Sequence, residues 1–130
     1  MLNQVTLIGR LTKDPELKKS KNGKSVLTVF IALNRTYHSA DGIQADYPPV
    51  ILWDKNAENT AKYCVKGSLV AIDGHLRTRK IEKENQPNVY VLEVVAERIV
   101  FLDSRKKPED VEVQENIDEL MNSLAAQIPE

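Results

Sequence analysis

Five segments of the chain have patterns that predict β-strands. In four of them apolar side chains recur at every second position, as on one face of a sheet, and the remaining one, residues 50–53, is a short extended run that is apolar throughout. Gly9 interrupts the first segment and is expected to mark a bulge or bend. In the second segment both alternating sets are largely apolar, which is typical of a strand at the centre of a sheet. The five predicted strands span residues 3–12, 26–37, 50–53, 68–80 and 89–101.

One segment between the third and fourth strands follows a helical pattern instead. In residues 54–66 apolar side chains recur at helical spacing, with Asp54 as the expected N-cap and Gly67 as a natural stop. This order of elements is that of the OB-fold, a five-stranded Greek-key β-barrel. The SH3-like barrel is the closest alternative, and the position of the helix favours the OB-fold. We therefore predict an all-β fold, a five-stranded OB-fold with one helix between strands 3 and 4.

The charges of the chain are segregated, although the net charge is only −1. Residues 1–107 hold all 18 Lys and Arg with 12 acidic residues, a net of +6, whereas residues 108–130 hold seven acidic residues and no base, a net of −7. We therefore expect a basic domain over 1–107 and an acidic tail over 108–130. Lysines are dense in residues 18–24, a predicted loop with Asn-Gly turn chemistry. A basic body suits a polyanionic partner such as nucleic acid, and an ordinary solvated surface is the alternative.

The acidic tail also carries a helical pattern of apolar residues. Five side chains recur at positions i, i+3, i+4, i+7 and i+11, which predicts a short amphipathic helix. We expect this helix to dock on the body, on a second copy or on another protein, or to occupy the basic groove as an acidic competitor. A loosely ordered tail is the alternative, because so short a helix is marginal alone. The predicted docking residues are Ile117, Leu120, Met121, Leu124 and Ile128.

Three of the seven aromatic residues are candidates for a platform on which nucleobases stack. Tyr37 ends the second predicted strand, and Tyr47 and Trp53 point to the same side of the third if the chain stays extended between them. Base–aromatic stacking contributes about 1 to 3 kcal/mol per base and tolerates any sequence. A position in the core is the alternative for Trp53, because it follows three apolar residues.

The fourth predicted strand has one apolar face and one polar face. Near its end, Arg77, Arg79 and Lys80 form a cationic stripe that suits a phosphate backbone. The alternative is a solvated edge in which Glu82 and Glu84 pair with these cations.

The sequence offers little for catalysis, metal binding or a cofactor. Neither His38 nor His75 stands near an arrangement typical of nucleophilic or metal catalysis, and no glycine-rich phosphate loop is present. The single Cys64 cannot form a disulfide within the chain and is expected to be buried. We expect no enzyme activity, no metal and no cofactor. We also expect a cytoplasmic location, because no segment has the length of a membrane span and the N-terminus lacks a secretory signal pattern.

Several short motifs occur together in the order of a known family. They are Asn3-Gln4-Val5, Ile8-Gly9-Arg10-Leu11, Asp14-Pro15-Glu16, Lys66-Gly67-Ser68, Leu76-Arg77-Thr78-Arg79-Lys80, Tyr90 and Glu93-Val94. Through these motifs residues 1–103 resemble the bacterial and phage single-stranded-DNA-binding proteins. The resemblance implies an OB-fold that binds single strands without sequence preference, assembles as a homotetramer and needs no cofactor.

The resemblance also implies roles for individual residues. Tyr37, Tyr47 and Trp53 fall where the family places base-stacking aromatics. Ile81 stands where many members have a further stacking aromatic, and we expect it to make an apolar contact with a base. Lys55, Arg77, Arg79 and Lys80 match positions that the family uses for phosphates. Apart from the resemblance, we also expect phosphate contacts from Arg10, Lys13 and Arg35.

Two other departures from the family concern the sheet edge and the tail. Pro48 and Pro49 replace more usual strand residues and are expected to reshape the edge beside Tyr47. The family commonly ends in an acidic tip finishing Ile-Pro-Phe that recruits replication and repair enzymes, whereas this chain ends Gln127-Ile128-Pro129-Glu130. We therefore expect the tail helix to have another docking role toward replication or recombination proteins, as suits a competence-related or phage paralogue.

Together these features predict a protein that binds, protects and organises exposed single strands in DNA replication, recombination and repair. The alternative is an OB-fold replication accessory module that acts mainly through protein–protein docking. In that case Trp53→Ala and Tyr47→Ala would change DNA affinity little. A nuclease is a further alternative, and the sequence shows no carboxylate cluster clearly built to hold its metal.

Overall fold

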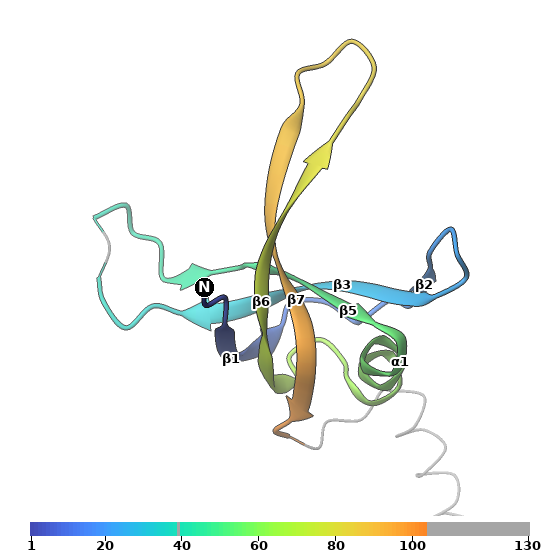
Figure 1. Cartoon of the computed structure of the whole chain (residues 1–130). Coiled ribbons are helices and arrows are strands. Elements are labelled where there is room, and N and C mark those ends of the chain that lie inside the picture. The colour runs from blue at the N-terminus through green and yellow to red at the C-terminus, as the bar shows by residue number, and fades with distance from the viewer. Residues whose placement is uncertain (39, 104–130) are drawn as a thin grey trace, which may run out of the picture.

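Five long strands and one helix make up the body of the molecule (Figure 1). The computed structural model describes residues 1–38 and 40–103, so the predicted tail and its docking residues lie outside the described part. Two short strands accompany the long ones. The elements are β1 (Val5–Leu11), β2 (Lys18–Lys19), β3 (Ser25–Asn34), β4 (Ala45–Asp46), β5 (Pro49–Trp53), α1 (Asp54–Tyr63), β6 (Leu69–Ile81) and β7 (Val89–Phe101).

The five long strands close into a barrel. β1 pairs with β6 along most of its length and with β3 at its end, where Leu11 lies opposite Ile31. β3 pairs with β5, β5 runs parallel to β7, and β7 pairs with β6, so the pairings return to β1. With α1 between β5 and β6, this arrangement confirms the predicted OB-fold. β2 and β4 are additions that the pattern did not predict, because each has only two residues.

The barrel interior is filled by the side chains that alternation had placed on one face. Leu27, Val29 and Ile31 of β3 are buried, as are Val50 of β5 and Ile72 of β6. β3 pairs with both β1 and β5, which confirms its predicted place at the centre of the sheet. Its outer face is nevertheless not covered. Thr28 and Phe30 are exposed, because they lie on the outer surface of the barrel.

Gly9 lies where β1 leaves one neighbour for another. Residues up to Arg10 pair with β6, and Arg10 and Leu11 pair with β3. A Cβ atom at position 9 would collide with the backbone oxygen of Ala32 and with the side chain of Ile31. The close approach of β1 to β3 therefore requires glycine here, and the bend predicted at Gly9 coincides with this change of partner.

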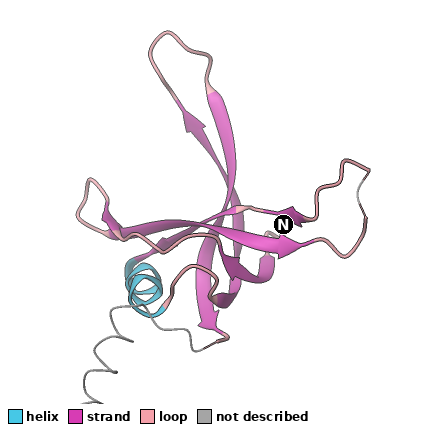
Figure 2. Cartoon of the chain, turned by 180° about the vertical axis from the view of Figure 1, so that it is seen from behind, coloured by secondary structure: helices cyan, strands magenta, loops and turns pink. Residues whose placement is uncertain are grey.

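The β6–β7 hairpin continues beyond the barrel. β6 pairs with β7 from Val70 to Ile81, whereas β1 accompanies β6 only between Leu69 and Gly74. The far half of the hairpin therefore projects from the body, which Figures 1 and 2 both show. Helix α1 packs against β3, β5 and β7 at the end of the body away from the hairpin tip (Figure 2).

The helix differs from its prediction at both ends. It ends at Tyr63 rather than at Lys66, because Cys64 is extended and its N–H closes the last turn on the Thr60 carbonyl. The N-cap position belongs to Trp53, and Asp54 is the first helical residue, with a φ of 52°. Asp is among the residues that tolerate this left-handed backbone. The expected burial of Cys64 is confirmed.

The second predicted strand is shorter than the pattern indicated. β3 ends at Asn34, so Tyr37 lies in the loop that follows it and not at a strand end.

No helix among the described residues has the length and apolar character that crossing a membrane requires.

Candidate nucleic-acid interface

Side chains from three strands, β3, β5 and β6, meet in a groove on the outer surface of the barrel. In the β3–β5 pair Trp53 lies opposite Val26, and Ile51 lies opposite Thr28. Ile51 is also beside Val95 of β7, so the same face continues onto the β6–β7 hairpin. The resulting hollow has a volume of about 470 Å³. We call it the Trp53 groove, and it is lined by Val26, Thr28, Ile51, Trp53, Arg77, Thr78 and Arg79.

Trp53 has the environment that a stacking residue needs. Its side chain is half-buried at the end of β5 and lines the groove, so it is neither sealed in the core nor fully exposed. Because the side chain is already partly packed, it has few alternative rotamers. It therefore loses little conformational entropy when a planar ligand stacks on the open side of its ring. Tyr37 and Tyr47 are exposed but do not line the Trp53 groove. Tyr37 instead lines a separate hollow in the loop that joins β3 to β4.

Arg77 and Arg79 enter the groove together, held by a carboxylate that the sequence had not indicated. Glu93 of β7 lies directly opposite Arg77 and is 2% exposed. Its Oε1 accepts hydrogen bonds from Nε and Nη2 of Arg77 at 3.0 and 2.6 Å. The same oxygen lies 3.4 Å from Nε of Arg79. Glu82 and Glu84, the partners in the alternative of a solvated edge, do not hold these two arginines, and Oε1 of Glu82 lies 2.9 Å from Nζ of Lys80.

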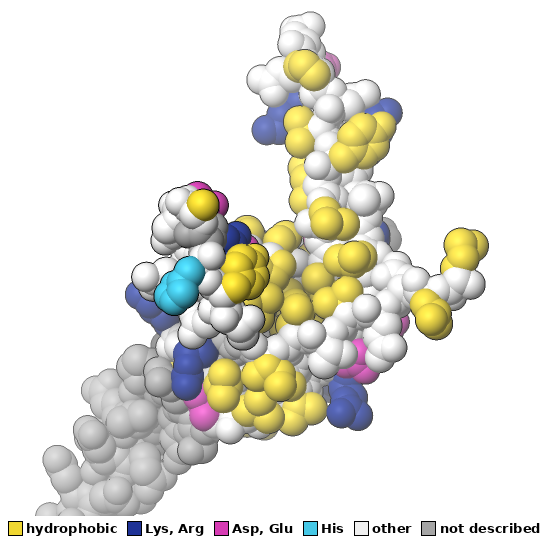
Figure 3. Space-filling view, turned by 90° about the vertical axis from the view of Figure 1, so that its left-hand side faces the viewer, with side chains coloured by type: hydrophobic (Ala, Val, Ile, Leu, Met, Phe, Trp, Pro, Cys, Tyr) yellow, Lys and Arg dark blue, Asp and Glu magenta, His cyan; other side chains and the backbone are white. Residues whose placement is uncertain are grey.

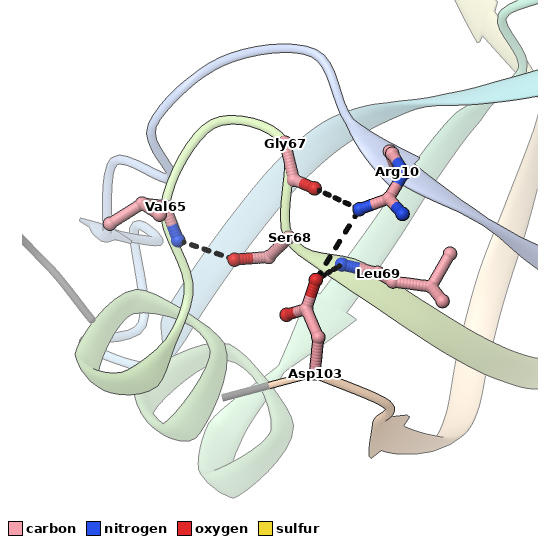
Figure 4. A network of polar contacts seen from close by, with 6 residues as sticks. All are labelled: Arg10, Val65, Gly67, Ser68, Leu69 and Asp103. Atoms are coloured by element: carbon pink, nitrogen blue, oxygen red, sulfur yellow. Dashed lines mark hydrogen bonds and ion pairs between the residues drawn. The ribbon is translucent and has the colours of Figure 1, made fainter. Parts of the chain in front are cut away.

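Arg10 belongs to a network at the base of the barrel, shown in Figure 4. Its guanidinium donates to the Gly67 carbonyl at 2.9 Å and to Oδ2 of Asp103 at 3.3 Å. The same Asp103 oxygen accepts the backbone N–H of Leu69 at 3.1 Å. Arg10 therefore ties β1 to the start of β6 and to the end of β7. Its predicted phosphate contact stays a prediction.

Arg35 is held by carboxylates next to its own loop. Its Nε and Nη2 donate to the two carboxylate oxygens of Asp46 at 3.0 and 2.7 Å. Its Nη1 lies 3.8 Å from Oδ1 of Asp41. This bidentate hydrogen bond raises the pKa of Arg35 and lowers the pKa of Asp46 below its usual value. The guanidinium also lies over the ring of Tyr37, 5.7 Å from its centroid. These contacts order the start of the loop.

The remaining predicted contacts are spread over the surface. Lys55 is highly exposed on the first turn of α1, with Nζ 3.7 Å from Oε2 of Glu58. Lys13 is exposed and lines a shallow hollow beside Phe30. Ile81 is half-buried at the end of β6. Among the predicted site residues that the structure describes, only Trp53, Arg77 and Arg79 share the groove.

Two lysines next to Trp53 were missed as site residues. Lys21 and Lys24 line a hollow that adjoins the groove and shares Trp53 with it. The density of lysines in residues 18–24 was visible in the sequence. Their position was not, because it depends on β2 folding back so that Lys18 pairs with Val26, the residue opposite Trp53.

Phe30 was also missed. Its side chain is 48% exposed on the outer side of β3, two residues from Thr28 of the groove. The alternation pattern had placed Phe30 on the second face of a central strand. Because Phe30 and Thr28 are two residues apart, they share that face, and this shared parity was the signal that could have identified Phe30.

Within residues 1–38 and 40–103, no three His, Cys, Asp or Glu side chains cluster in a way that would hold a metal ion.

Comparison with known proteins gives one consistent result. Residues 2–102 match the Single-strand binding protein family. "Single-stranded DNA-binding protein B" of Bacillus subtilis (strain 168) is 50% identical over 108 residues, which cover 82% of this chain and 96% of that protein.

Two further relatives are longer than the matched region. "Single-stranded DNA-binding protein" of Bacillus cereus is 46% identical over 106 residues, which cover 81% of this chain and 62% of that protein. "Single-stranded DNA-binding protein 2" of Staphylococcus aureus (strain Mu50) is 46% identical over 106 residues, which cover 81% of this chain and 75% of that protein. The chain therefore belongs to the single-strand binding protein family, as its motifs had indicated.

Proposed function

We propose that this protein binds single-stranded DNA without sequence preference, with the Trp53 groove at the centre of its contact surface. The convergence of Trp53, Arg77 and Arg79 carries the proposal, since it sets a stacking ring beside two cations. The relatives' names, single-stranded DNA-binding proteins, support the same ligand. Each stacked base contributes about 1 to 3 kcal/mol, and the arginines add a salt-dependent attraction to phosphates.

Other side chains extend this surface in our proposal. Tyr37 and Tyr47 provide further stacking, and Ile81 an apolar contact with a base. Phe30 adds an exposed ring on the outer side of β3. Phosphates are contacted by Lys13, Lys21, Lys24, Lys55 and Lys80. Arg10 and Arg35 contribute least, because their guanidinium groups already bond to Asp103 and Asp46.

Self-association into a homotetramer is part of the proposal. Exposed hydrophobic side chains follow the projecting hairpin and the adjoining body (Figure 3). On the barrel, Ile8 and Val100 are exposed on either side of Ala71, which pairs with both. Apolar rows of this kind on a small protein mark interaction surfaces. The mass in solution can be measured by sedimentation equilibrium. A mass of four chains would support the proposal, and a mass of one chain would contradict it.

In the cell, we propose that the protein protects and organises exposed strands during replication, recombination and repair, in the cytoplasm. Docking of replication or recombination proteins by the tail stays a prediction, because residues 104–130 lie outside the described part. The accessory-module alternative, which acts mainly through protein docking, is tested by the same experiment as DNA binding itself.

That experiment compares Trp53→Ala with Tyr63→Ala by fluorescence anisotropy of a labelled dT oligonucleotide. Tyr63 is an exposed aromatic at the end of α1 that does not line the groove. We expect Trp53→Ala to weaken binding by about 1 to 3 kcal/mol and Tyr63→Ala to leave it nearly unchanged. Thermal unfolding of each variant reports any loss of fold. Equal affinity of Trp53→Ala and the unmodified protein would contradict the proposal and favour the accessory module.

A further inference from the structure

A buried carboxylate lies beneath the proposed phosphate-binding arginines. Glu93 is 2% exposed, whereas the side chains of Arg77 and Arg79 are 39% and 54% exposed. A negative charge on a surface that binds DNA repels phosphates, and an ionised group is costly to bury. Its presence therefore calls for a physical explanation. The inference that follows rests on the proposed binding of single-stranded DNA.

The two arginines are not held equally. Arg77 is directly opposite Glu93 in the β6–β7 pair and donates two hydrogen bonds to Oε1, at 3.0 and 2.6 Å. Arg79 is one step further on the same face, in the diagonal position, and its contacts with Glu93 are longer, at 3.4 and 3.5 Å. Arg77 is therefore anchored by the buried carboxylate, and Arg79 is only loosely held.

We propose that Glu93 is a positioning residue for DNA binding, which fixes Arg77 beside Trp53 and leaves Arg79 to exchange its loose contact for a phosphate. Without a carboxylate between them, two arginines two residues apart on one strand face would repel each other and sample many rotamers. Glu93 removes that repulsion and orders both side chains before DNA arrives, so less conformational entropy is lost on binding.

The proposal and simple electrostatics predict opposite signs for Glu93→Gln. Removal of a negative charge beside a phosphate site should tighten binding if charge alone matters. If Glu93 positions the arginines, the same change should weaken binding to a dT oligonucleotide, by about 3- to 10-fold. Glu93→Asp keeps the charge but shortens its reach, and should weaken binding as well.

Glu97→Gln is the matched control. Glu97 is an exposed carboxylate on the same strand, where it lies 3.0 Å from His75 and contacts neither arginine. We expect this change to leave the affinity unchanged within about 2-fold, or to tighten binding slightly.

The salt dependence of binding tests whether Arg79 contacts a phosphate and whether Glu93 acts through Arg79. Arg79→Gln should reduce the slope of log affinity against log salt by about 0.7, the value for one lost single-strand phosphate contact. Glu93→Gln should leave the slope unreduced, because both cations remain. In a double-mutant cycle, Arg79→Gln should cost less affinity in the Glu93→Gln background than in the unmodified protein.

Three results would overturn the inference. These are Glu93→Gln binding as tightly as the unmodified protein or more tightly, additive effects in the cycle, and an unchanged salt slope for Arg79→Gln.

If Glu93→Gln does not fold, Arg77→Lys decides the question, because it keeps the charge and loses the two-donor contact. Arg77→Lys should lose the same 3- to 10-fold, and full affinity would overturn the inference. Failure of the unmodified protein to bind the oligonucleotide would instead refute the proposed function itself.

Discussion

At the scale of single residues, ion pairs divide the cations of the surface into two groups. Arg10 and Arg35 are hydrogen-bonded to Asp103 and Asp46, at 3.3 and 2.7 Å, and stabilise the barrel base and a loop. Lysines such as Lys21 and Lys24 are exposed next to Trp53. The distinction matters for function, because a cation that must first leave a carboxylate contributes less to phosphate binding. Arg77, which Glu93 anchors at 2.6 Å, belongs with Arg10 and Arg35 in this respect, whereas Arg79 is held only loosely.

The Arg35–Asp46 pair predicts a pH dependence. Its hydrogen bond lowers the pKa of Asp46, so the carboxylate stabilises the folded loop at neutral pH. This contribution is present above the unfolded pKa and is lost as the pH falls through the lower folded pKa, below about pH 4. An NMR titration of the Asp46 carboxyl carbon measures the shift. In Arg35→Gln the pKa should return to its usual range, and an identical titration in both proteins would contradict the assignment.

The residues of the groove show how far the sequence could predict the site. Trp53, Arg77 and Arg79 were found one at a time, from parity and from motifs of a known family. Their convergence depends on the parallel pairing of β5 with β7, where Ile51 meets Val95. Glu93 was missed for the same reason, because a carboxylate 14 to 16 residues away from the arginines is brought to them only by the hairpin register.

At the scale of elements, alternation predicted the long strands well because the barrel buries one face of each. It failed where tertiary contacts end a segment. The helix stops at Tyr63 because Cys64 leaves the helical conformation and is buried in the core. β3 stops at Asn34, although the apolar pattern suggested a longer strand. The short β2 lies within a basic loop that carried no strand pattern at all.

Strand β1 provides the prediction at this scale. Gly9→Ala would place a methyl group against the backbone oxygen of Ala32, so the β1–β3 contact must open. We expect a loss of about 1 to 3 kcal/mol in the free energy of unfolding. Thr6→Ala, at an exposed position of the same strand, should stay within about 0.5 kcal/mol. Urea unfolding at one fixed protein concentration, followed by Trp53 fluorescence, measures both. Equal stability of Gly9→Ala and Thr6→Ala would show that β1 does not approach β3 so closely.

At the scale of the whole molecule, the order of elements was enough to predict a barrel, and the barrel explains where the groove lies. Closure buries one face of every long strand and leaves side chains on the outer faces of β3 and the hairpin exposed, with Trp53 of β5 half-buried beside them. The outer surface therefore carries both the proposed DNA contacts and the apolar rows proposed for self-association. The alternation pattern could not separate these two uses, because both place exposed side chains on the same strands.

Fluorescence of Trp53, the single tryptophan of the chain, tests the central claim most directly. The protein is titrated with a dT oligonucleotide at low and high salt, and with duplex DNA of equal length as the control. If bases stack on Trp53 beside Arg77 and Arg79, single strands should quench the emission strongly, duplex should not, and binding should weaken as salt rises. Saturating single-stranded DNA that leaves the emission unchanged would contradict a DNA-binding role for the Trp53 groove.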